Sequence, residues 1–362
     1  MAKPRARDLG LDFPGTPGSC NALTDVPGVL VGYTTLIDND AGPVRTGVTA
    51  ILPFGHDPVP RPVWAGQFSL NGNGEMTGVH WIHDAGYFLG PVCITNTHSV
   101  GIVHHAATRW IIDTYRDAFG DEHVWAMPVV AETYDGVLND IDGQHVRAAH
   151  AIGAIESAAG GQPAEGNVGG GTGMVCYEFK GGTGTASRIV ELGGEAFTVG
   201  ALVQANHGIR DWLTILGAPV GREMRNDLLK SRESGSIIVV IGTDAPLSPL
   251  SLQHLARRAS IGIGRHGTPS GNSSGDIFLA FSTANKRTLP QLSEARQSFD
   301  FISNEVLDPC YLAAVESVEE AVVNALVAAE SMTTVRPQGL ICRAIDHDAL
   351  RDAMRRHGRL RE

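Results

Sequence analysis

The chain is poor in aromatic residues and in cysteine. Only 6% of its 362 residues are aromatic, and its five cysteines are scattered without a CxxC pair. An odd, unclustered set of thiols argues against a disulfide framework and against a cysteine-bound zinc, and it indicates a reducing compartment. The cysteines are Cys20, Cys93, Cys176, Cys310 and Cys342.

The chain also lacks a cluster of positive charge and a long apolar run. Its formal net charge is −11 and no stretch is rich in Lys and Arg, which argues against nucleic acid or an anionic membrane as a partner. No apolar run approaches the ~20 residues that a membrane helix needs. The basic residues 1–7 are not followed by the apolar segment of a signal peptide. We therefore expect a cytoplasmic enzyme, with export by another route left open.

The common cofactor and metal motifs are missing. The glycine-rich run 166–173 lacks the Lys of a phosphate-binding loop, and it leads into a predicted strand where a dinucleotide site needs a helix. This run is either close packing at a strand edge or a loop that lines a site. His104 and His105 are adjacent instead of four residues apart, and no HExxH motif occurs. We expect no metal and no cofactor.

The nucleophile elbow GxSxG of a Ser/His/Asp hydrolase is also missing. Gly235-Ser236-Ile237 has no glycine two residues after the serine. The stretch 271–276 comes nearer to the pattern, but it precedes a predicted strand where the elbow requires the serine to follow one. Histidine-dependent serine hydrolysis is therefore not expected.

Glycine is abundant, with 44 residues, and apolar segments alternate irregularly between strand and helix patterns. This pattern predicts a mixed α/β chain in which helices pack on sheets. Strands are expected at 29–33, 46–53, 65–70, 91–97, 125–131, 174–179, 197–204, 237–241, 276–282 and 340–345. Helices are expected at 102–119, 142–159, 248–259, 308–332 and 346–359, and an exposed loop at 217–234.

The stretch around Ser236 is the most informative. Five β-branched residues, Ile237 to Ile241, follow this serine between two glycines, which is typical of a strand buried on both faces. Ser236 is then either a plain loop residue that caps a core strand or a nucleophile held at the mouth of that strand. If the Gly235–Ser236 bond were cut, the new α-amine, with an ordinary pKa near ~8, would serve as the base for the Ser236 hydroxyl.

Six separate motifs, in the right order, resemble the DmpA/BapA-type aminopeptidases. This family comprises the L-aminopeptidase/D-amidase/D-esterase and β-aminopeptidase group of self-processing N-terminal-nucleophile hydrolases. The resemblance covers most of the chain. The motifs are SLNGNGEMTG at 69–78, ETYDG at 132–136, GNVGGGTG at 166–173, Gly235-Ser236, SGD at 274–276 and FSTAN at 281–285.

The resemblance implies that the precursor cleaves itself between Gly235 and Ser236. A single 1–362 domain would become an α chain of residues 1–235 and a β chain of residues 236–362, with Ser236 as the nucleophile. Ser274 and Asp276 match the supporting serine and acidic residue of the family. Characterised members carry Glu at the acidic position, so Asp276, which is one methylene shorter, keeps the charge and leaves the exact hydrogen-bond relay open.

Three further positions match family residues. Asn206 and Tyr134 would stabilise an oxyanion, because an amide and a phenol both donate hydrogen bonds. Glu132 would bind the free amino group of the substrate. From the residues alone, Asn206 is equally a turn residue, Tyr134 a core residue, Glu132 a surface carboxylate and Asp276 a strand cap.

The family implies a four-layer αββα sandwich and a homo-oligomer of αβ units. The expected activity is hydrolysis of an amide bond, or of an ester bond, after an N-terminal residue of a small peptide, amino-acid amide or ester. Two alternatives stay open. The first is an acyltransferase on a related self-cleaving scaffold, and the second is a non-catalytic protein that binds a small ligand with its glycine-rich loops.

Overall fold

The computed structural model describes residues 3–39, 42–121, 124–229 and 235–361. The last part of the predicted loop 217–234, residues 230–234, lies outside this description. Two large sheets dominate the described chain, a six-stranded sheet in the order β4-β3-β12-β11-β10-β9 and a four-stranded sheet in the order β1-β2-β5-β6. The strands of the first sheet are β3 (Val63–Gly72), β4 (Tyr87–Phe88), β9 (Gly182–Leu192), β10 (Glu195–Asn206), β11 (Gly235–Thr243) and β12 (Ser274–Ser282). The strands of the second sheet are β1 (Leu30–Asp38), β2 (Val44–Leu52), β5 (Val92–Asn96) and β6 (Val129–Thr133).

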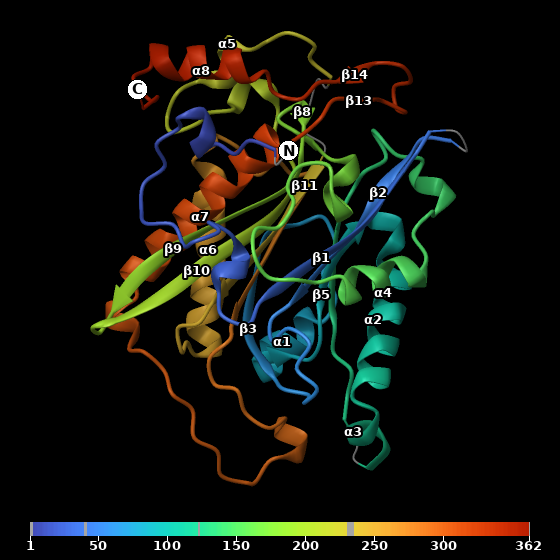
Figure 1. The fold of residues 1–362 in the computed structure, drawn as a ribbon, viewed down its shortest axis with the longest axis vertical. Helices are drawn as coiled ribbons and strands as arrows, with labels where there is room; N and C mark the ends of the chain where they lie inside the picture. The colour runs from blue at the N-terminus through green and yellow to red at the C-terminus, as the bar shows by residue number, and fades with distance from the viewer. Residues whose placement is uncertain (1–2, 40–41, 122–123, 230–234, 362) are drawn as a thin grey trace.

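Helices cover the outer face of each sheet. Figure 1 shows α6 and α7 on the left, beyond the six-stranded sheet, and α2 and α4 on the right, beyond the four-stranded sheet. This order of layers confirms the predicted αββα sandwich. No helix among the described residues is long and apolar enough to cross a membrane. The helices are α1 (Val79–Ala85), α2 (Val100–Thr114), α3 (Arg116–Asp121), α4 (Ala148–Glu156), α5 (Val220–Glu223), α6 (Pro249–Gly264), α7 (Asp308–Val327) and α8 (His347–Arg356).

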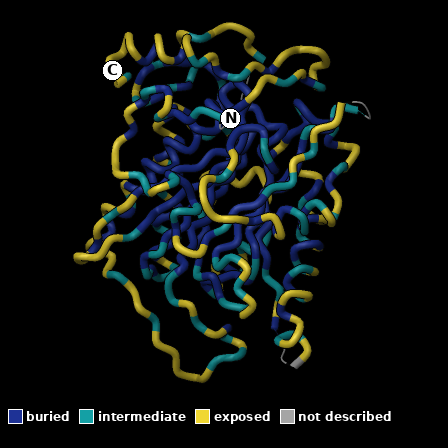
Figure 2. The backbone as a smooth tube through the Cα atoms, in the orientation of Figure 1, coloured by how far each residue is buried: buried dark blue, intermediate teal, exposed yellow. Residues whose placement is uncertain are grey.

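Strand β11 lies in the middle of the molecule and is buried on both faces. Ile237 and Val239 pack toward α6 and α7, whereas Ile238 and Val240 pack between the two sheets. This alternation follows from the two-residue period of a strand. Figure 2 shows that burial is concentrated in the sheets, and that the exposed backbone belongs mainly to loops and outer helices. The predicted strand 237–241 is confirmed, and it begins two residues earlier, at Gly235.

The two-residue strands β4 and β13 (Met332–Thr333) and one long strand were not predicted. Strand β9 pairs with β10 over its whole length, but its first half is made of Gly, Thr, Ala and Ser and shows no apolar pattern. The structure gives the reason at Gly184, where a Cβ would clash with the carbonyl oxygen of Ala321 in α7. Small residues therefore let the longest helix approach the sheet closely.

Several predicted segments have different bounds. The segment 174–179 forms two short strands, because Tyr177 and Glu178 have positive φ angles of 50° and 62° between them. The predicted helix 102–119 is divided into α2 and α3 at Tyr115, and the helix predicted at 142–159 is reduced to α4. Strand β6 begins at Val129 instead of residue 125, helix α7 ends at Val327, and only Ile341–Cys342 of the last predicted strand pairs. The paired short strands are β7 (Val175–Cys176) with β8 (Phe179–Lys180), and β13 (Met332–Thr333) with β14 (Ile341–Cys342).

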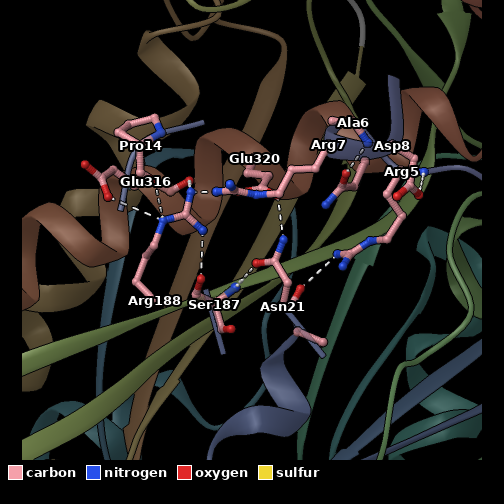
Figure 3. A network of polar contacts seen from close by, with 12 residues as sticks. Arg5, Ala6, Arg7, Asp8, Pro14, Asn21, Ser187, Arg188, Glu316 and Glu320 are labelled. Atoms are coloured by element: carbon pink, nitrogen blue, oxygen red, sulfur yellow. Dashed lines mark hydrogen bonds and ion pairs between the residues drawn. The ribbon is translucent and has the colours of Figure 1, made fainter. Parts of the chain in front are cut away.

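A buried polar network attaches the N-terminal segment to α7 (Figure 3). The carboxylate of Glu320 accepts hydrogen bonds from Arg7 at 2.8 and 2.9 Å, from Arg188 at 2.7 Å and from the Asn21 amide at 2.6 Å. The side-chain oxygen of Asn324 accepts from the backbone N–H of Ala6 at 2.9 Å. Every donor in this group precedes residue 235 and both acceptors follow residue 236.

Candidate active site

Ser236 lies at the start of β11, between two neighbouring strands. It is opposite Asn206 of β10 and beside Gly275 of β12. Its side chain is on the same face as Ile238, which is the face between the two sheets. The hydroxyl oxygen accepts a hydrogen bond from the backbone N–H of Gly275 at 3.1 Å, and the residue is 6% exposed. Ser236 is therefore a fixed strand residue and not a surface loop serine.

Asn206 is the last residue of β10, so it is part of the strand and not of the following turn. Its side-chain oxygen accepts from the backbone N–H of Val175 at 2.8 Å. Its side-chain nitrogen donates to the backbone oxygen of Tyr134 at 2.9 Å. These two bonds fix the orientation of the amide, and an amide nitrogen carries a second N–H that can point toward a ligand.

Ser274 and Asp276 form a buried pair at the start of β12. The Ser274 hydroxyl donates to the Asp276 carboxylate at 2.6 Å, and both residues are fully buried. Ser274 is in register with Gly235 in the parallel pairing of β11 and β12. The pair therefore lies next to the Gly235–Ser236 peptide bond. Because Asp276 is inside the strand, the view of it as a mere strand cap is wrong.

Glu132 is buried in β6, with 3% of its surface exposed, and is not a surface carboxylate. One carboxylate oxygen accepts from the backbone N–H of Glu75 at 3.0 Å, and the other accepts from the Thr97 hydroxyl. Burial raises the pKa of Glu132, and these hydrogen bonds only partly oppose the rise. Gly74 lies between this carboxylate and strand β12, because a Cβ on Gly74 would lie 3.1 Å from Glu132 Oε1 and 3.6 Å from the Cα of Gly275.

Tyr134 follows the end of β6 and is 40% exposed, so it is not a core residue. Its ring lies over Gly136, where a Cβ would clash with the phenol hydroxyl. The backbone of Tyr134 contacts the site through Asn206, and its side chain lies at the exposed rim. All six predicted residues are thus brought to one end of the β-strands, with Ser236, Asn206, Ser274 and Asp276 on three adjacent strands.

The sequence reasoning missed the groups that hold these residues. They include the backbone N–H groups of Gly275, Val175 and Glu75, which bond to Ser236, Asn206 and Glu132. Gly275 and Glu75 belong to two of the motifs given above, so these motifs were the sequence signal that could have pointed to their backbone N–H groups. Every residue except proline has a backbone N–H, so the residue type does not reveal such a donor. Val175 lies in no motif, and no sequence signal pointed to it. No three His, Cys, Asp or Glu side chains are grouped to hold a metal within the part of the chain that the structure describes.

Comparisons with known proteins place this geometry in one family. Residues 21–339 match Peptidase family S58. The chain is 48% identical to the β-peptidyl aminopeptidase BapA of Sphingosinicella microcystinivorans, with 99% of this chain and 93% of the relative covered. It is 42% identical to the BapA of Sphingosinicella xenopeptidilytica, with 98% and 92% covered.

Solved structures indicate the same family as the sequence comparisons. The L-aminopeptidase D-Ala-esterase/amidase of Ochrobactrum anthropi, described as a variant of the N-terminal-nucleophile hydrolase fold, is 58% identical with a TM-score of 0.95, and the match covers 99% of this chain and 100% of that one. The PH0078 protein of Pyrococcus horikoshii is 40% identical with a TM-score of 0.92, and 99% and 100% are covered. The predicted family, fold and type of enzyme are confirmed. The chain therefore belongs to peptidase family S58, as a hydrolase of the aminopeptidase kind with an N-terminal-nucleophile hydrolase fold.

Proposed function

We propose that this chain cuts itself between Gly235 and Ser236 and then hydrolyses peptides with the new N-terminal serine. The observation that carries the proposal is the position of Ser236. Its hydroxyl is fixed by Gly275 N–H, Asn206 lies across from it, and the Ser274–Asp276 pair lies beside the bond to be cut. Intact-mass measurement of the purified protein tests the proposal, because it requires fragments 1–235 and 236–362.

In the cleavage step the Ser236 hydroxyl oxygen attacks the carbonyl carbon of Gly235. The peptide C–N bond breaks, the proton lost by the hydroxyl passes to the nitrogen, which becomes the α-amine of Ser236, and an ester joins Gly235 to Oγ. Water then hydrolyses the ester, which releases the Gly235 carboxylate and restores the hydroxyl. A glycine before the serine favours this step, because it adds no side chain beside the attacked carbonyl.

In the peptidase cycle the α-amine takes the proton of the Ser236 hydroxyl as Oγ attacks the substrate carbonyl. The negative oxygen of the tetrahedral intermediate receives hydrogen bonds from the Asn206 amide and the Tyr134 phenol. The proton then passes to the leaving amine as the C–N bond breaks. The α-amine finally activates the water that hydrolyses the acyl-enzyme.

The Ser274–Asp276 pair would hold the α-amine in place. The Ser274 hydroxyl donates its hydrogen bond to Asp276, so the lone pairs of its oxygen stay available to accept an N–H from the amine. The shorter Asp side chain still reaches Ser274 at 2.6 Å. This distance supports an unbroken relay despite the missing methylene.

Glu132 would bind the substrate ammonium and so restrict the enzyme to free N-termini. Replacing Glu132 with Gln is expected to raise KM for an aminoacyl amide by about tenfold or more, because a hydrogen bond between charged groups is lost. In the wild-type enzyme, KM is expected to rise on acidification at a pH above the range of an ordinary glutamate, because burial raises the pKa of Glu132 and the protonated acid no longer attracts ammonium.

Steady-state kinetics from neutral to acidic pH measure both effects. Glu75→Gln is the matched control, since its exposed side chain lies near the same site, and it is expected to keep the wild-type KM at neutral pH; its charge contributes to the raised pKa of Glu132, so the acidic rise in KM moves to lower pH. Equal KM values for wild type and Glu132→Gln at every pH would contradict the assignment.

We further propose that substrates are small peptides, amino-acid amides or amino-acid esters, and that αβ units assemble into a homo-oligomer. A cytoplasmic location stays a prediction from the sequence. Size-exclusion chromatography with light scattering tests the assembly, and cell fractionation tests the location.

A further inference from the structure

The rim of the site is built by a hairpin from the far end of the chain. The segment between β13 and β14 folds over the loop that follows Tyr134, and the backbone N–H groups of Val335 and Arg336 both donate to the Val137 oxygen, at 2.7 and 3.2 Å. Leu138, Val175 and Cys342 pack together beneath it. Figure 1 shows β13 and β14 at the same end of the molecule as β8 and the start of β11.

Arg336 projects from this hairpin onto the same rim. Its guanidinium forms an ion pair with Asp142 at 2.5 Å and is 48% exposed. Hydrogen bonds to Asp142 and to the Tyr134 phenol raise the pKa of Arg336. The Asp142 contact uses one nitrogen of a group that carries five N–H donors. A half-exposed guanidinium in contact with Asp142 and Tyr134 therefore keeps N–H donors for a further acceptor.

The rim around Tyr134 carries a second arginine besides Arg336. A second guanidinium, that of Arg45, donates to the backbone oxygens of Leu138 at 3.0 Å and Thr333 at 2.5 Å and to the side-chain oxygen of Asn39 at 2.7 Å. These acceptors are neutral, so none of them compensates the charge of Arg45. Asp142 pairs with Arg336 and with His98, whereas Arg45 is held by neutral oxygens.

Glu132, the carboxylate proposed to bind the substrate ammonium, and Tyr134 have different hydrogen-bond and packing partners. Glu132 bonds with Glu75 and Thr97, whereas Tyr134, two residues later, contacts Gly136 and Arg336. Glu132 therefore offers a negative group suited to an ammonium, and Arg336, which contacts Tyr134 two residues further along the chain, offers a positive group suited to a carboxylate. This polarity matches a short peptide with both termini free, which carries opposite charges at its ends.

We propose that Arg336 binds the carboxylate of the leaving amino acid, so that the enzyme prefers short peptides with a free C-terminus to the corresponding C-terminal amides. The inference rests on the proposed function, in which the bond cleaved is the one that follows the N-terminal residue. The planar fork of Arg suits a carboxylate, since both oxygens can be bonded at once.

The test compares a dipeptide with a free carboxylate and the same dipeptide as its C-terminal amide. The kcat/KM of the free dipeptide divided by that of the amide is expected to fall about tenfold in Arg336→Gln, because one charged hydrogen bond is lost. The kcat/KM for the amide is expected to fall much less than that for the free dipeptide, because the amide makes no such bond. Arg336→Lys keeps the charge but loses the fork, and we expect an intermediate ratio.

Two further variants sharpen the test. Asp142→Asn removes the competing carboxylate, so the same ratio is expected to rise above wild type. Arg343→Gln is the matched control, because it removes an exposed arginine that directly follows β14 and pairs with Asp227, and its ratio is expected to equal that of wild type. The ratio is also expected to fall toward that of Arg336→Gln as salt is added, since an exposed ion pair is screened.

A wild-type ratio in Arg336→Gln, or an equal loss for both substrates, would overturn the role of Arg336. If Arg336→Gln does not fold, Asp142→Asn decides, since a ratio at or below wild type rejects the proposal. These outcomes are read only on enzyme that is active and cut at Ser236. An uncut wild-type chain, or one active without Ser236, rejects the proposed function instead, so the two failures are distinguishable.

Discussion

Replacement of Ser236 with alanine is expected to leave one uncleaved chain that hydrolyses no peptide. The side chain supplies the nucleophile for the cut, and without the cut the nitrogen of residue 236 stays an amide that cannot act as a base. Both functions are lost at once, so the loss of activity is expected to reach the detection limit. A denaturing gel and intact-mass measurement follow the cleavage, and hydrolysis of an aminoacyl amide follows the activity.

Ser282→Ala is the matched control for this experiment. Ser282 is also a buried serine of this sheet, and its hydroxyl donates to the Ala245 oxygen at 2.7 Å. It lies at the opposite end of β12 from Ser274, so the variant is expected to be cut and active. Two fragments from Ser236→Ala, or hydrolysis at the wild-type rate, would show that another residue is the nucleophile.

The sequence could predict the central strand and the order of the site residues, because both depend on local pattern. Five β-branched residues between glycines can hardly be anything but a buried strand. The motif positions then gathered at one end of the sheets as expected. What local pattern left open was the environment of each side chain. From the sequence, Glu132 could equally be a surface carboxylate and Tyr134 a core residue. The burial of Glu132 and the exposure of Tyr134 exclude these alternatives.

The contacts that pattern could not predict are remote in sequence. Arg336 and Asp142 are 194 positions apart, and neither belongs to a motif or to a regular apolar period. Strand β9 was missed for a related reason, since its small residues are selected by the close approach of α7 and not by an apolar face. Tertiary packing overrides local preference in both cases.

The proposed cut raises the question of how the two pieces stay together. The network around Glu320 gives a physical answer, because its donors Arg7, Asn21 and Arg188 would belong to residues 1–235 and Glu320 itself to residues 236–362. Burial alone would raise the pKa of Glu320, but the hydrogen bond from Arg7 and the charge of Arg188 outweigh it and lower the pKa. The stabilisation is therefore present above the ordinary glutamate pKa and is lost as the pH falls through the lowered value.

Glu320→Ala is expected to lower the free energy of unfolding by about 3–5 kcal/mol, because it leaves buried Arg188 with its main partner removed. The effect is measured by urea unfolding in the uncut Ser236→Ala background, where the single chain cannot separate into pieces. Glu330→Ala is the matched control. Glu330 also joins the N-terminal segment, through Lys3 at 3.2 Å, but its side chain is 70% exposed, so a cost of about 1 kcal/mol or less is expected.

In the cut enzyme the same substitution is expected to let the fragments separate on dilution, which size-exclusion chromatography at decreasing concentration detects. The uncut background separates the two effects, since it reports stability alone while the cut enzyme also reports association. Equal stability losses for Glu320→Ala and Glu330→Ala would contradict this role of the buried network. They would leave the strand pairing of β11 with β10 and of β12 with β3, together with the apolar packing of α7 against β9 and β10, to hold the fragments together.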